Sequence, residues 1–168
     1  MAACREHRLV RGSASDLHGL ILMRGAEQAV VEKWIKERLA TKSADFEALS
    51  FGLSQRVFDS LADDDAEYPY IIYQCQVPPR DILGVGTFRV MVDTMYIVKA
   101  VAQVSSYDPL APIASVIDSA LTSAEGSGVS GGVVFTSVRD KAHSVIEMIE
   151  GKQVRNLGGE YAIKAQGF

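Results

Sequence analysis

The sequence lacks the thiol patterns on which zinc and dithiol chemistry depend. It has only two cysteines, Cys4 and Cys75, and they lie far apart in the chain. Structural zinc sites and catalytic dithiols need closely spaced pairs such as Cys-x-x-Cys. We therefore expect neither, and we interpret Cys75 as a buried, reduced thiol in a protein made in a reducing compartment.

Long apolar runs and clustered cations are also missing. The run at residues 20–23 is too short for a membrane span or for the core of a signal peptide. The net charge is −4, and lysine and arginine are scattered along the chain. A surface that grips nucleic acid needs clustered cations to displace counterions from phosphates, so we do not expect one. DNA passing through a channel without being held remains compatible with this composition.

Glycine-rich and acidic stretches are present, but not in the order that ligand loops require. Gly126 and Gly128 follow a predicted helix and precede a predicted strand, whereas a phosphate loop lies between a strand and the helix that follows it. The three carboxylates at residues 63–65 lack the alternating ligands and central glycine of a calcium loop, which favours a surface turn.

No catalytic set stands out among the nucleophiles and bases. Ser137, Asp140 and His143 could be written as a triad, but no nucleophile elbow surrounds them. We therefore predict a protein that is not an enzyme and that has no cofactor and no metal site. A small cytosolic enzyme or a ligand-binding module remains the alternative from another class.

What the sequence does contain is enough apolar residue for one stable domain. Its 168 residues are 48% hydrophobic and 23% charged, and a chain of this length buries a core without disulfide or metal support. Residues 1–24 show no sustained period and carry Arg5, Arg8 and Arg11, which favours an N-terminal arm. The domain itself is predicted to span residues 25–168.

Two segments have the spacing of amphipathic helices. In residues 27–41, Val31, Trp34, Ile35 and Leu39 form one stripe, so Trp34 is predicted to anchor the core. A second helix is predicted to begin with Asp108 as its N-cap and Pro109 in its first turn. Its apolar side consists of Leu110, Ile113, Ile117, Leu121 and Ala124.

Six segments are predicted as strands: residues 55–59, 68–77, 93–104, 133–139, 144–150 and 160–166. Pro78 and Pro79 are expected to end the second of these, and Gly158 and Gly159 to form a tight turn before the last. The strand at 93–104 is apolar on both faces, so it needs cover on both sides or a partner surface. The fold class that follows is α+β, a single domain with a mostly antiparallel sheet and two main helices packed on one face.

The order of these weak features resembles the tail terminator, or tail completion, proteins of long-tailed bacteriophages. An amphipathic helix is followed by Arg56-Val57-Phe58 and then by the run from Tyr68 to Tyr73, where that family begins its first long strand. Met91-Val92-Asp93 and Tyr96 to Lys99 are similar to its central strand. Leu110 to Leu121 is similar to its second helix, and Gly158-Gly159-Glu160-Tyr161 to its closing turn and strand.

The resemblance implies a structural virion protein at the head–tail junction, made in the host cytoplasm. Such a protein forms a homo-oligomeric ring, usually of six copies, at the head-proximal end of the tail tube. The ring ends tube polymerisation and docks the head-tail connector or stopper protein, with DNA only as passive cargo and no membrane contact. Another neck component, a head-closure or adaptor protein, is the alternative within the same class.

The segment at residues 80–92 is the predicted assembly interface. It combines glycines with apolar side chains between two strands, and a loop of that length in a compact domain is usually functional. We expect it to pack against a neighbouring subunit or the tail tube; folding back on its own sheet as a hairpin arm is the alternative. The candidate contact residues are Ile82, Leu83, Val85, Phe88, Arg89, Met91 and Val92.

Overall fold

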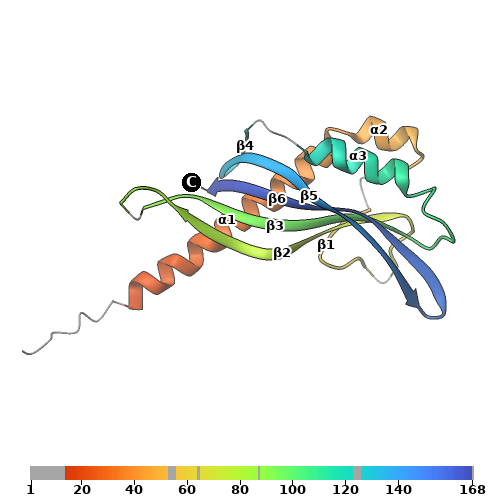
Figure 1. The fold of residues 1–168 in the computed structure, drawn as a ribbon, viewed down its shortest axis with the longest axis horizontal. Coiled ribbons are helices and arrows are strands. Elements are labelled where there is room, and N and C mark those ends of the chain that lie inside the picture. The colour runs from red at the N-terminus through yellow and green to blue at the C-terminus, as the bar shows by residue number, and fades with distance from the viewer. Residues whose placement is uncertain (1–13, 53–55, 64, 87, 123–125, 168) are drawn as a thin grey trace, which may run out of the picture.

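The computed structural model describes residues 14–52, 56–63, 65–86, 88–122 and 126–167, with side chains from residue 26 onward. Nine elements follow one another along the chain (Figure 1): α1 (Ala14–Ala40), α2 (Ser43–Ala48), β1 (Val57–Asp59), β2 (Tyr70–Leu83), β3 (Arg89–Ala102), α3 (Ala111–Leu121), β4 (Ser127–Val129), β5 (Gly132–Ile149) and β6 (Lys152–Gly167). Helix α1 runs without interruption through residue 24, and the predicted domain boundary there stays a prediction.

All six strands belong to one curled sheet in the order β1-β2-β3-β6-β5-β4. Every neighbouring pair is antiparallel except β1 and β2, which are parallel. The predicted mostly antiparallel sheet is therefore confirmed. Because strand residues outnumber helical ones, the molecule is mainly β rather than the α+β protein that we expected.

The core lies between the helices and one set of alternating sheet residues. Trp34 is 2% exposed, as predicted for a core anchor, and its Nε1 donates a hydrogen bond to the Ser127 hydroxyl of β4. Helical and strand side chains share a single buried cluster, whose members include Val31, Ile35, Leu39, Ile71, Tyr73, Tyr96, Val98, Ile113, Ile117, Tyr161 and Ile163. Burial of this apolar surface is the main stabilising contribution to the fold.

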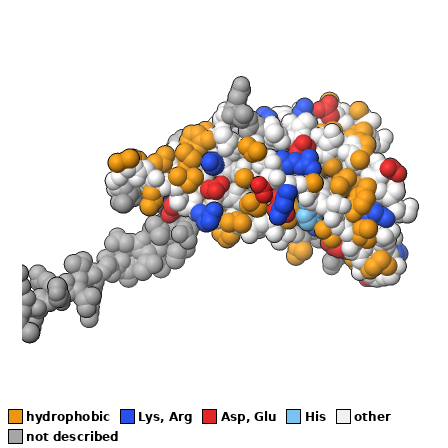
Figure 2. All heavy atoms as spheres, viewed as in Figure 1, with side chains coloured by type: hydrophobic (Ala, Val, Ile, Leu, Met, Phe, Trp, Pro, Cys, Tyr) orange, Lys and Arg blue, Asp and Glu red, His pale blue; other side chains and the backbone are white. Residues whose placement is uncertain are grey.

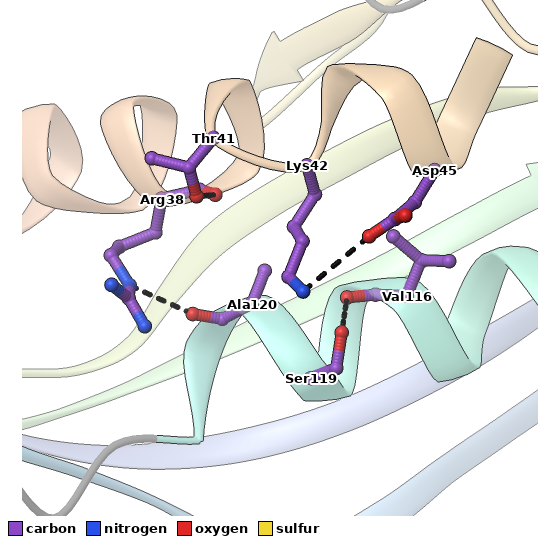
Figure 3. A network of polar contacts seen from close by, with 7 residues as sticks. All are labelled: Arg38, Thr41, Lys42, Asp45, Val116, Ser119 and Ala120. Carbon is purple, nitrogen blue, oxygen red and sulfur yellow. Dashed lines mark hydrogen bonds and ion pairs between the residues drawn. The ribbon is translucent and has the colours of Figure 1, made fainter.

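Polar side chains connect the helices to the sheet and to one another. The Tyr96 hydroxyl in β3 donates to Glu32 of α1, and the Tyr161 hydroxyl in β6 donates to Asp118 of α3, each over 3.3 Å. Where α1 ends, the Arg38 guanidinium donates to the carbonyl oxygen of Ala120 in α3 over 2.9 Å (Figure 3). These bonds tie α1 and α3 to each other and to the two central strands.

Side chains of β2 alternate between the two faces of the sheet. Ile71 and Tyr73 are fully buried in the main core, while Tyr70 belongs to a second, smaller cluster with Val101 and Val154. Phe58, Ala62, Ala66 and Ile72 pack against this second cluster. Strand β3, apolar on both faces, is thus buried in the main core on one face and partly covered on the other.

Two predicted strand boundaries were wrong. Pro78 and Pro79 do not end β2, because register shifts between Val77 and Arg80 accommodate both prolines and pairing with β3 continues to Leu83. The predicted strands at 133–139 and 144–150 are one strand, β5, with a register shift between Arg139 and Lys141.

The predicted turn at Gly158 and Gly159 is also wrong, since both glycines lie in the middle of β6. A Cβ on Gly158 would come within 2.1 Å of the Val98 carbonyl oxygen in β3, so close backbone approach explains the glycine. The chain instead turns at Glu150 and Gly151, both with positive φ.

The start of α3 also differs from the prediction. Leu110 is the N-cap and makes no side-chain capping bond, and the helix begins at Ala111 with Pro112 in its first turn. Asp108 lies before the helix and accepts a hydrogen bond from the Ser106 hydroxyl over 2.9 Å. The proline in the first turn of α3 is therefore Pro112 and not Pro109, although either could occupy that position by preference.

Candidate assembly surfaces

The segment predicted as a long loop is the tip of a hairpin formed by β2 and β3. Gly84 donates its backbone N–H to the Phe88 carbonyl oxygen over 2.8 Å, and Gly86 has a φ of +91°, which favours glycine. The hairpin arm that was the alternative in the sequence analysis is thus what forms. Its tip projects from one end of the elongated molecule (Figure 1).

Three of the predicted contact residues form an exposed apolar patch, which we call the tip patch. Leu83 is 57% exposed, Val85 96% and Phe88 62%. Apolar side chains at a protruding end have no core to enter, so a contiguous patch of this kind marks a candidate contact surface.

The other predicted contact residues have different surroundings. Ile82 and Met91 are half-buried partners across the β2–β3 ladder. Val92 is fully buried in the main core, so its inclusion in an interface was wrong: the alternation of β3 turns it toward the helices. Arg89 ion-pairs through Nη2 with Glu27 of α1 over 2.6 Å and through Nη1 with Asp81 over 3.7 Å.

The Arg89–Glu27 pair fixes the hairpin to the helix. Glu27 is 1% exposed, and a carboxylate that is buried to this extent requires a cationic partner. Arg89 therefore stabilises the base of the tip, at the point where it pairs with Leu83.

A second apolar surface was not predicted at all. The far half of β5 and the start of β6 extend as a hairpin arm at the other end of the molecule (Figure 1). Val145, Ile146, Met148 and Ile149 are 37%, 49%, 67% and 44% exposed, and we call them the arm patch. Figure 2 shows hydrophobic side chains at both ends, with lysine, arginine and acidic side chains between them.

Periodicity could have indicated the arm patch. Residues 145–149 place apolar side chains on both faces of a strand, as in the strand at 93–104 that the sequence analysis singled out. In β3 the main core shared with the helices covers one face and the second cluster partly covers the other, whereas Val145, Ile146, Met148 and Ile149 of β5 belong to neither cluster. Cover from other elements, which the sequence pattern of one strand does not give, decides which of the two is exposed.

The structure separates the residues of the triad that the sequence analysis set aside. Ser137 is fully buried on the core side of β5, whereas His143 is half-buried, six residues farther along the same strand. Six strand residues span roughly 20 Å, which is far beyond hydrogen-bond reach. Burial, reinforced by the charge of Lys99, lowers the pKa of the His143 imidazole below its usual value.

Cys75 is partly buried rather than fully buried. Its Sγ lies 3.4 Å from the Val77 carbonyl oxygen and 3.8 Å from the Thr94 hydroxyl. Among the described residues, no three histidine, cysteine, aspartate or glutamate side chains come together as a metal-binding group. Within the same part of the chain, no helix is both long and apolar enough to cross a membrane.

Two open grooves flank β1, with volumes of about 520 and 610 Å³, and Val57 lines both. In the first, the Arg56 guanidinium is ion-paired with Glu67 over 3.1 Å. In the second, Lys36 lies beside the ring of Tyr73, and the Tyr73 hydroxyl raises the pKa of the Lys36 ammonium group. The cations of both grooves thus already have partners within the chain.

Comparison with known proteins identifies the fold but no family. The sequence matches no protein family and no curated protein. The structure is similar to a chain in the solved virion of a native gene transfer agent (GTA) particle, with a TM-score of 0.60 and 14% identity. The similarity covers 86% of this chain and 98% of that one. At such low identity the similarity shows that the two chains share a fold.

Proposed function

We propose that this protein is a structural component of a phage-like particle and that it forms a ring at the head-proximal end of the tail tube. In this role the ring, of six copies in the resembled family, ends tube polymerisation and offers a docking surface to the head connector. The observation that carries the proposal is the fold shared, over nearly the whole of both chains, with a component of a gene transfer agent virion.

The exposed apolar patches support the assembly part of this proposal. Monomeric proteins rarely keep contiguous apolar surface exposed, and here such surface lies at both ends of one elongated chain. Contacts between two different surfaces of identical subunits close into a ring when the rotation between subunits allows it. A ring would cover both patches in every copy.

Native mass and electron microscopy test the proposal together. Sedimentation at micromolar concentration should give one species several times the 18.2 kDa of the chain. Micrographs of tail tubes mixed with the protein should show a ring at one end of each tube, and tubes incubated with it should stop growing. A monomer that binds no tubes would refute the proposal, and a ring that binds only the connector would favour an adaptor protein instead.

A further inference from the structure

The outer edge of β5 is open along most of its length. Strand β4 pairs only with Gly132, Val133 and Val134, whereas β6 pairs with the other edge of β5 as far as Ile149. Among the described residues, nothing pairs with the outer edge from Val138 to Ile149, and no loop there donates a backbone hydrogen bond to it. An open strand edge presents unpaired backbone N–H and C=O groups to any strand that approaches it.

The opposite edge of the sheet is protected better. On β2, strand β1 covers Ile71 to Tyr73, and the two prolines at 78 and 79 interrupt the edge with an irregular register. Prolines and irregular register are usual means of preventing unwanted pairing. The far half of β5 contains no proline, and the arm patch adds apolar side chains on both of its faces.

We propose that the open edge of β5 is completed by the β2–β3 hairpin tip of a second copy of this chain. The pairing strand is the part of β2 beyond the prolines, residues 80–83, which lies beside the tip patch. This inference rests on the proposed ring and specifies the contact that would build it.

Strand directions favour this partner. From β2 through β3 and β6 to β5, each strand is antiparallel to the one before, so β5 runs opposite to β2. A second copy whose strands run in the same direction as those of the first therefore presents its β2 antiparallel to the open edge of β5. The sheet would continue from one subunit to the next in the antiparallel pattern that it already has.

Side chains on the two surfaces also match. Ile146 and Met148 pair across the ladder with Arg155 and Gln153 and extend the helix-facing side of the sheet beyond the helices. Leu83, Val85 and Phe88 of the neighbour would cover them with apolar surface. Since the two patches differ, the contact is heterologous, and each subunit uses its tip for one neighbour and its arm for the other.

Co-expressed cysteine variants test the contact directly. Val85→Cys and Met148→Cys place one thiol on each patch at exposed positions, so neither change disturbs the core. Mild oxidation should give a reducible covalent dimer when the two variants are co-expressed, and none with either variant alone or with the wild-type protein. A dimer of Met148→Cys with itself would show pairing of β5 with β5 and would overturn the proposal.

A charge variant provides the quantitative test. Met148→Lys should weaken self-association at least tenfold, because a lysine buried in the contact would lack a partner. It should leave thermal unfolding of the subunit unchanged, since Met148 is 67% exposed in the single chain. Leu61→Lys, at an 81% exposed position in the loop between β1 and β2, is the matched control and should leave association unchanged.

The outcomes separate this contact from the ring itself. If wild-type protein and both Met148 variants form rings of equal stability without cross-links, the β5 contact is refuted and the ring stands. If the wild-type protein is a monomer that leaves tail tubes uncapped, the ring is refuted and the contact with it.

Discussion

Arg89 illustrates how a charged residue in an apolar segment can serve the fold rather than a partner. The sequence places it among contact candidates, but its guanidinium is held between Glu27 and Asp81. Pairing with an arginine offsets the cost of burying a carboxylate, and that carboxylate is left without compensation if the arginine is removed.

Arg89→Met should therefore destabilise the protein by about 3 kcal/mol, measured by urea unfolding, because it leaves Glu27 buried and unpaired. The double variant Glu27→Leu/Arg89→Met should regain most of that loss, since no buried charge remains. Equal losses in the single and the double variant would show that packing of the arginine stem, rather than charge, is what matters.

Gly158 offers a second test at the scale of one side chain. Gly158→Ala should lower the free energy of unfolding by about 2 kcal/mol or more, since the added methyl group would meet the backbone of β3, which cannot rotate away. Gly128→Ala in β4 is the control: a Cβ there meets nothing within 4 Å, and its stability should not fall. A neutral Gly158→Ala would mean that β3 and β6 can separate at this point.

At the scale of elements, the hairpin tip can be tested apart from the subunit that carries it. Replacing Leu83, Val85 and Phe88 together with serine should change subunit stability by less than about 1 kcal/mol, because all three are largely exposed. Self-association, measured by sedimentation, should be lost. The same change at Leu49 and Leu61, also exposed, should preserve it. If the triple variant still assembles, the tip patch is not an interface.

The elements that sequence predicted well are those whose signal is local. Alternation located β2 and β3, and helical spacing located α3 and the part of α1 that carries Trp34. The failures came from long-range contacts. Pro78 and Pro79 are tolerated because β2 lies near the sheet edge, and Gly158 is required by a strand distant in sequence.

Of the two candidate surfaces, one has a local signal in the sequence and the other does not. Apolar residues flanked by glycines identified the tip patch, because that composition is itself local. The arm patch was missed, since a strand that is apolar on both faces has the same sequence pattern whether other elements cover those faces or leave them exposed.

For the whole molecule, the arrangement of charge predicts how assembly responds to salt. The two patches are apolar, and the charged side chains lie mostly between them (Figure 2). At about 1 M salt, charge interactions are screened beyond about 3 Å. Self-association should persist there and strengthen in sulfate, which favours apolar burial. Rings that dissociate at high salt would point to a contact through the charged middle instead.

The position of α1 in the core has a consequence for the order of synthesis. Its apolar stripe packs on β6 and β5, and Trp34 bonds to Ser127, all of which leave the ribosome after it. At about 5–20 residues per second, α1 waits on the order of ten seconds for these partners. During that interval the apolar stripe of α1 lacks its partners in β5 and β6. The nascent chain is then exposed to holding chaperones, and the synthesis of β6 ends that exposure.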